Sequence, residues 1–167
     1  MGLLSFIKEA GEKLFSKGQA QTAMTAAKAD PSSAEKTKAA NDAAGDAILA
    51  YIDTQGLKAT GLTVSFDGAT ATATVYGVAD RQATKEKIVL CCGNVEGVAS
   101  VNDQMTVDQS APEAQYYPVI KGDNLSKISK QYYGDPNKYV KIFEANKPML
   151  KSPDLIYPGQ MLRIPPQ

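Results

Sequence analysis

Apolar residues near the start of the chain recur at three- and four-residue spacing. The repeat consists of Leu3, Phe6, Ile7, Ala10 and Leu14, and charged residues fill most of the opposite side. This period matches one face of an α-helix. We therefore expect an amphipathic helix over residues 1–15 that packs on its own domain, with attachment to a membrane surface as the alternative.

The next stretch, residues 16–43, carries almost no large apolar side chain. Ala, Lys, Thr, Gln and Ser dominate it, and such a segment cannot bury enough surface to hold one tertiary position. We interpret it as a low-complexity insertion, a linker or a loosely held helix. Within it, Ser32 and Glu35 have the spacing of a capping box, which indicates a helix start after Asp30-Pro31.

From residue 44 onward the pattern predicts regular elements. Helical spacing runs through Ala44, Ile48, Leu49 and Ile52. Alternation then begins at Leu62 and continues beyond Asp67-Gly68, a pair typical of a two-residue hairpin turn. A helix over residues 81–92 with Asp80 as its cap and a strand over residues 98–107 complete a first domain, residues 44–108.

The end of the chain has a second set of elements after a polar linker, residues 109–115. Residues 116–167 read as a short strand, a Gly122-Asp123 turn, two helices and a closing strand that follows Tyr157-Pro158-Gly159. The fold class we expect is α+β, with two small domains that are each an antiparallel sheet covered by helices.

The amino-acid composition argues against several classes of function. The chain has no histidine, which removes the commonest general base and imidazole metal sites, so we do not expect an enzyme. The chain has 18 Lys plus Arg and 18 Asp plus Glu, so its formal net charge is zero and no overall positive charge attracts nucleic acid. Cys91 and Cys92 are adjacent and are expected as buried free thiols.

No segment approaches the roughly twenty apolar residues of a transmembrane helix, and the N-terminus lacks the pattern of a secretory signal. We therefore expect a cytoplasmic protein.

Two motifs resemble known domains. Residues 117–129 and 156–165, in their order and spacing, resemble a LysM domain. The stretch Gly97-Val98-Ala99-Ser100-Val101-Asn102-Asp103, with the preceding helix and hairpin, resembles a BON domain. A short amphipathic N-terminal helix, one BON domain and one C-terminal LysM domain together resemble the bacterial potassium-binding protein family.

That resemblance implies reversible binding of K⁺ in the cytoplasm, as an ion sensor or buffer in osmotic adaptation, by a monomer. A cage of neutral carbonyl oxygens can bind K⁺ by replacing its shell of water. We hypothesise backbone carbonyl ligands from the end of the N-terminal helix and from the glycine-rich turn, namely Ile7, Ala10, Gly93, Val95 and Val98. The alternative is an ordinary turn with a packed helix.

The LysM resemblance implies a second ligand, an N-acetylglucosamine-containing glycan. The family's groove lies between two turns, which here are Gly122, Asp123, Asn124 and Leu125 on one side and Met149, Leu150, Ile156 and Tyr157 on the other. The competing interpretation is that these residues form turns and core. The corresponding alternative function is a cell-envelope adaptor, with LysM on peptidoglycan and BON on phospholipid or a partner protein.

Overall fold

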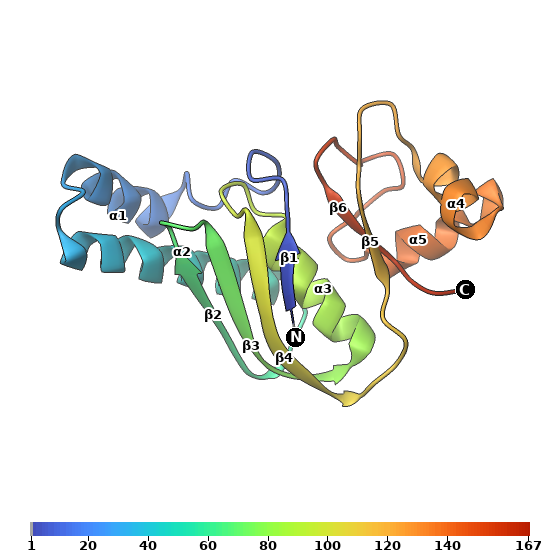
Figure 1. The fold of residues 1–167 in the computed structure, drawn as a ribbon, viewed down its shortest axis with the longest axis horizontal. Helices are drawn as coiled ribbons and strands as arrows, with labels where there is room; N and C mark the ends of the chain where they lie inside the picture. The colour runs from blue at the N-terminus through green and yellow to red at the C-terminus, as the bar shows by residue number, and fades with distance from the viewer. Residues whose placement is uncertain (1) are drawn as a thin grey trace.

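A four-stranded sheet forms the centre of the first domain in the computed structural model, which describes residues 2–167 (Figure 1). Its strands are β1 (Gly2–Ser5), β2 (Thr60–Asp67), β3 (Thr72–Arg81) and β4 (Ser100–Gln109), in the order β1-β4-β3-β2. β2 and β3 are antiparallel, whereas β3 and β4 are parallel and are joined by α3 (Gln82–Gly93). We expected an antiparallel sheet, but this sheet is mixed. The helix α3 crosses back over the sheet, so β4 runs in the same direction as β3.

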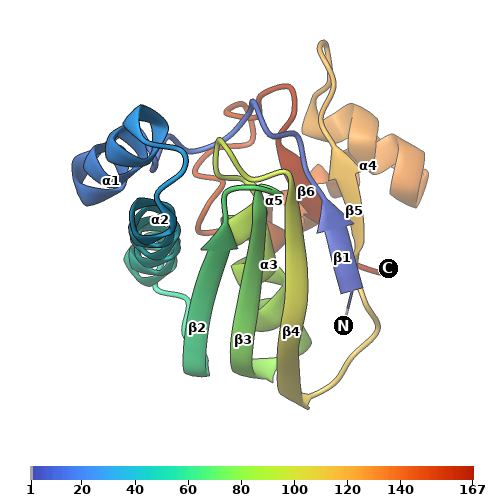
Figure 2. The ribbon, with the colours of Figure 1, turned by 60° about the vertical axis from the view of Figure 1, so that its left-hand side comes forward.

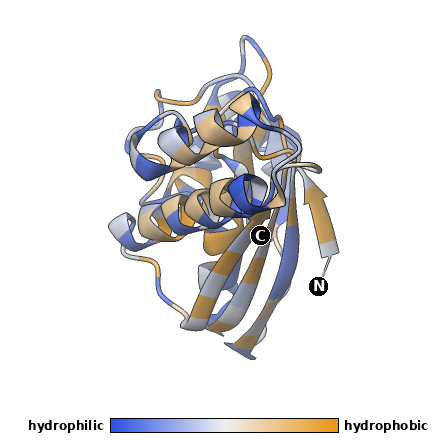
Figure 3. Ribbon diagram, turned by 90° about the vertical axis from the view of Figure 1, so that its left-hand side faces the viewer, coloured by the Kyte–Doolittle hydropathy of each residue, from blue (hydrophilic) through white to orange (hydrophobic). Residues whose placement is uncertain are grey.

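Helices α2 (Ala34–Thr54) and α3 cover one face of this sheet (Figure 2). Apolar and polar residues alternate along the strands (Figure 3), and Val75 is buried while its neighbour Tyr76 is exposed. Around α3 the consecutive residues 88–92 are all buried. This part of α3 is buried on several sides because it lies between the sheet and the second domain, and a helix in such a position is apolar all round. Cys91 and Cys92, on this helix, are free and buried, as predicted.

The N-terminal helix prediction was wrong. Residues 2–5 form the edge strand β1, in which Leu4 pairs with Val101 of β4, and residues 6–15 contain no helix. Gly11 has a φ of +120°, outside the helical region. Strand pairing satisfies the backbone groups of residues 2–5 that face β4, and it also covers the edge of β4, which a helix could not pair with. Met1 lies outside the described residues.

The segment 16–43 is mostly helical rather than an irregular insertion or linker. It contains α1 (Gly18–Ala29) and the first turns of α2. The two helices pack together with Ala20 and Ala40 buried, because alanine allows close approach and favours helix. The cap of α2 is Ser33, whose Oγ accepts a hydrogen bond from the Lys36 N–H (3.2 Å). The predicted cap was one residue earlier.

The hairpin turn is longer than the predicted two residues. β2 ends at Asp67 and β3 begins at Thr72. The Asp67 carboxylate accepts hydrogen bonds from the Ala69 N–H (2.9 Å) and the Thr70 hydroxyl (3.0 Å). This turn is therefore organised by an aspartate side chain, with Ala71 at a φ of +52°.

The second domain follows the predicted order of elements. It consists of β5 (Gln115–Pro118), α4 (Leu125–Tyr133), the 3-10 turn η1 (Pro136–Lys138), α5 (Tyr139–Ala145) and β6 (Met161–Ile164). β5 and β6 pair antiparallel, and α4 and α5 pack with them around a core that includes Ile128, Ile142 and Leu162. The α+β class with two small domains is confirmed.

Candidate functional site

The N-terminal loop, residues 6–15, lies along the glycine-rich turn that follows α3. The Glu12 N–H donates to the Asn94 carbonyl oxygen (2.8 Å), and the Glu12 carbonyl oxygen accepts from the Glu96 N–H (2.9 Å). A further hydrogen bond runs from the Gly97 N–H to the Lys8 carbonyl oxygen (2.7 Å). The two segments are therefore joined through their backbones.

Two glycines make this approach possible. A Cβ at Gly11 would lie 2.3 Å from the Asn94 carbonyl oxygen, and Gly11 also has a φ of +120°. A Cβ at Gly93 would lie 2.1 Å from the ring of Phe6. Real Cβ atoms do not approach other atoms so closely, so any side chain at either position would separate the loop from the turn.

All five carbonyls hypothesised as ligands lie on this loop or in this turn. The Ile7 oxygen accepts from the Ala10 N–H (3.1 Å), and the Val95 oxygen accepts from the Val98 N–H (3.0 Å). The other three, on Ala10, Gly93 and Val98, accept no backbone hydrogen bond within residues 2–167. Each carbonyl has two lone pairs, so every one of the five keeps capacity to accept a further partner.

Sequence reasoning missed the residues that hold the two segments together. The carbonyls of Lys8 and Glu12 take the turn's N–H groups, and their side chains give no hint of this role. Gly11 did carry a signal, because a glycine within a helical repeat costs about 1 kcal/mol relative to alanine and so weakens the helix prediction. No group of three or more His, Cys, Asp or Glu capable of holding a metal occurs among the described residues.

The second domain packs on the same turn. The Asn94 side chain donates to the Met161 carbonyl oxygen and accepts from the Met161 N–H, both at 2.9 Å. Gly159, with a φ of +88°, lies so close to the loop that a Cβ there would be 2.7 Å from Ala10 Cβ and 3.3 Å from Ile7 Cγ2. The loop carrying two candidate ligands is thus held between the two domains.

A buried ion pair adds to this interface. Glu86 of α3 accepts from Arg163 of β6, and both side chains are almost completely buried. The other Glu86 oxygen accepts from Gln82 and from the Ala114 N–H, each at 3.0 Å. A buried carboxylate is costly unless its oxygens are paired, and here both of them are.

The first turn of the predicted glycan groove is built from turn and capping interactions. Asp123 accepts from the Tyr117 hydroxyl (2.8 Å) and the Ile120 N–H (3.0 Å). Asn124 caps α4 by accepting from the Lys127 N–H (2.8 Å), while Leu125 is buried in the core. Gly122, at a φ of +89°, is exposed, and nothing lies within 4 Å of where its Cβ would be.

The second side of that groove faces the first domain instead. Met149, Leu150 and Tyr157 line a cavity of about 300 Å³ together with Glu12 and Tyr51. Burial, and then the nearby Glu12 carboxylate, raise the pKa of Tyr157 to about 12. The remaining residue of the predicted set, Ile156, packs against the core of the second domain. These residues therefore belong to the domain interface and the core.

Within residues 2–167, no helix has both the length and the apolar character needed to cross a bilayer.

Comparison with known proteins agrees with the two domains. Family models match the chain as a BON domain over residues 43–109 and a LysM domain over residues 117–165. An uncharacterized protein of Deinococcus radiodurans is 55% identical over 49 residues, which are 29% of this chain and 19% of that protein. The Potassium binding protein Kbp of Escherichia coli O6:H1 is 44% identical over 169 residues, covering 99% of each chain. The chain belongs to the family of BON–LysM proteins that includes this potassium-binding protein.

Proposed function

We propose that this protein binds K⁺ where the N-terminal loop meets the turn after α3, with the backbone carbonyls of Ile7, Ala10, Gly93, Val95 and Val98 as ligands. The relative named as a potassium binding protein matches along the whole chain, which supports the identity of the ion. We further propose that the protein works in the cytoplasm as an ion sensor or buffer.

The observation that carries this proposal is the backbone contact between loop and turn. It gathers five carbonyls onto two adjoining segments, and three of them accept no backbone hydrogen bond among the described residues. Neutral carbonyl oxygens can replace the water shell of a large, weakly hydrated ion such as K⁺. Ca²⁺ and Mg²⁺ instead favour carboxylate-rich sites.

The position of the loop supports a mechanism of compaction. Ala10 and Ile7 contact Gly159 of the second domain, and Asn94 binds Met161 across the interface. An ion that orders this loop would favour the docked arrangement of the domains over an open one. If K⁺ binds only the docked form, it stabilises that form by RT ln(1 + [K⁺]/Kd), about 2.7 kcal/mol at a hundred times Kd.

The test is thermal unfolding and small-angle scattering of the salt-exchanged protein in KCl, NaCl and choline chloride at matched ionic strength. We expect K⁺ alone to raise Tm and to reduce the radius of gyration. Identical results in the three salts would overturn the proposal.

Two glycine variants localise the site. Gly11→Ala places a Cβ against the Asn94 carbonyl, whereas Gly18→Ala also has a positive φ but meets nothing within 4 Å. We expect Gly11→Ala to lose the K⁺ response and Gly18→Ala to keep it. Retention of full K⁺ affinity by Gly11→Ala would exclude the loop as part of the site.

Glycan binding by the LysM domain is the second candidate. The observation in its favour is the exposed backbone of the Gly122 turn, where amide groups could reach an N-acetyl group. The cavity lined by Met149 and Tyr157 argues against a full groove in the docked state. Titration with chitin oligosaccharides in KCl tests this candidate, and binding that perturbs Gly122 would support it.

A further inference from the structure

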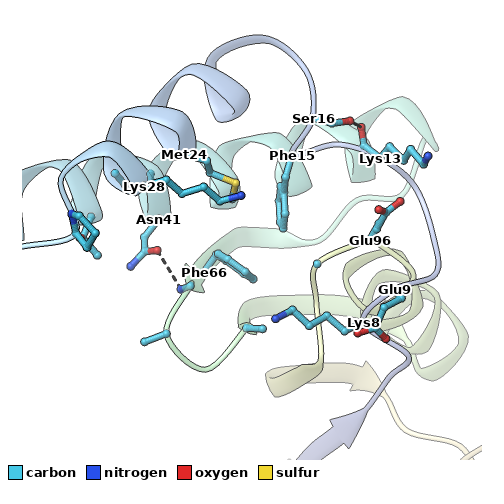
Figure 4. A pocket seen from close by; sticks show the side chains of 18 residues that line it. Lys8, Glu9, Lys13, Phe15, Ser16, Met24, Lys28, Asn41, Phe66 and Glu96 are labelled. Carbon is cyan, nitrogen blue, oxygen red and sulfur yellow. Dashed lines mark hydrogen bonds between the residues drawn. The ribbon is translucent and has the colours of Figure 1, made fainter.

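A second pocket opens on the other side of the N-terminal loop, with a volume of about 840 Å³ (Figure 4). Its walls come from the loop, from α1 and α2, and from the β2–β3 hairpin turn. Several of the residues that line the pocket are small, including Ala27, Ala40 and Gly68, so their side chains do not fill the space between these elements. The volume falls in the range of small-molecule sites, about 300–1,000 Å³.

The interior of the pocket is apolar. The rings of Phe15 and Phe66 stand 4.9 Å apart, inclined at 52°, and Met24 of α1 lies beside them. Phe66 belongs to the main core, while Phe15 and Met24 are only partly buried. The pocket therefore presents aromatic and thioether surface that a hydrocarbon chain could cover.

The rim of the pocket is charged. Lys28 comes from α1 and Lys8 from the loop, and Figure 4 shows Lys28 extending toward Phe15 while Lys8 lies below Phe66 in that view. Lys13 and two glutamates, Glu9 and Glu96, lie along the loop side. In the described part of the chain, none of these three lysines and neither glutamate forms a salt bridge. The pocket thus combines an apolar interior with a charged rim of three lysines and two glutamates, a small positive excess.

We propose that this pocket binds an aliphatic carboxylate of medium chain length. Its hydrocarbon chain lies against Phe15, Phe66 and Met24, and its carboxylate pairs with Lys28. Charge complementarity favours this ligand, because three lysines outnumber two glutamates on the rim, so an anionic head group meets more opposite charges than a cationic one does. The pocket shares the N-terminal loop with the proposed ion ligands but is lined by none of them, and it is separate from the glycan turn.

The test is calorimetric titration of the full chain with decanoate, and with decanol and decyltrimethylammonium as ligands of the same chain length. Running it in NaCl as well as KCl makes the result independent of the ion site. We expect decanoate to bind with one-to-one stoichiometry, and at least about tenfold more tightly than either analogue, a gap of 1.4 kcal/mol. Absence of decanoate binding in both salts, or equal binding of all three ligands, would overturn the proposal.

Matched variants locate the ligand. Ala27→Trp fills the pocket from α1, whereas Ala26→Trp places the same ring on an exposed position of that helix outside the pocket. Lys28→Gln removes one amine, and Lys17→Gln removes an exposed lysine that does not line the pocket. We expect Ala27→Trp to abolish binding, Lys28→Gln to weaken it about tenfold, and both controls to bind normally. Equal effects of a variant and its control, with circular dichroism unchanged, would contradict the assignment.

Discussion

Asn94 and Met161 are joined across the domain interface by two hydrogen bonds of 2.9 Å, from the Asn94 side-chain amide to the Met161 carbonyl and from the Met161 N–H to the Asn94 Oδ1. The asparagine side chain thereby pairs with the backbone of β6 as a neighbouring strand would. Because Asn94 also accepts the Glu12 N–H through its own carbonyl, one residue connects the N-terminal loop, the turn and the second domain.

Replacing the Asn94 side chain should weaken the connection to the second domain, while the backbone bond to Glu12 remains. Asn94→Ala leaves the N–H and C=O of Met161 without partners at a partly buried position, which should lower the free energy of unfolding by about 1–3 kcal/mol. We also expect a weaker K⁺-dependent compaction. Urea denaturation and scattering measure both effects, with Asn137→Ala as the control because the Asn137 side chain is exposed and forms no hydrogen bond within residues 2–167. Equal values for the two variants would contradict the role of Asn94.

Two glycine variants can separate the stability effect of the contact between Gly159 and the loop from the effect of backbone strain. Gly159→Ala adds a Cβ 2.7 Å from that of Ala10, whereas Gly134→Ala adds one at a similar positive φ with nothing within 4 Å. Both variants carry the strain of a left-handed alanine, about 1–2 kcal/mol. We expect Gly159→Ala to lose about 1–3 kcal/mol more through overpacking. The difference in Tm and denaturation midpoint measures this contact, and the additional change Ala10→Gly should restore part of the loss.

The Glu86–Arg163 pair predicts non-additive effects. Arg163→Met leaves the Glu86 carboxylate buried without its cation, which should cost about 3–5 kcal/mol of unfolding free energy. Adding Glu86→Gln removes that unpaired charge, so the double variant should be more stable than the sum of the single effects predicts. A double-mutant cycle in urea tests this. Additivity within about 0.5 kcal/mol would show that the pair contributes no coupling.

Alkaline pH should destabilise the protein through a buried thiol. Burial raises the pKa of Cys91 from 9.0 to about 12. The folded state then keeps a proton that the unfolded state releases above pH 9, so this stability is complete below pH 9 and is lost as pH rises toward 12. Between pH 8 and pH 10.5 the Cys91 contribution should fall by about 2 kcal/mol. Urea denaturation under reducing conditions should show a correspondingly smaller fall for Cys91→Val, and parallel pH curves would contradict this account.

Periodicity predicted the elements whose positions depend on burying one apolar face. Ile48 and Ile52 of α2 and Val101 and Met105 of β4 are buried core residues. β1 was missed because Leu3 begins a helical repeat with Phe6 and Ile7, and only the pairing of residues 2–5 with β4 shows that this segment is a strand. α1 was underestimated because alanine contributes little to apolar patterns although it allows close helix contact.

The candidate site was predictable only in outline. Gly93 and Gly97 marked a turn with unusual backbone freedom, and the whole-chain resemblance joined that turn to the N-terminus. The hydrogen bonds made by the carbonyls of Lys8 and Glu12 could not be read from the sequence, because every residue carries the same carbonyl group. The interface position of Met149 and Tyr157 was likewise hidden, since it depends on how the two domains dock.

The edge strand β1 has a consequence for assembly. Four residues pair with β4 and cover its outer edge (Figure 2), and the exposed side chain of Leu3 adds little to hold them there. A short edge strand of this kind can be exchanged between two copies of a chain, with each copy completing the sheet of the other. Residues 6–15 would travel with it, so each proposed ion site in such a swapped dimer would be built from two chains. Oligomeric state and ion affinity would then vary together with protein concentration.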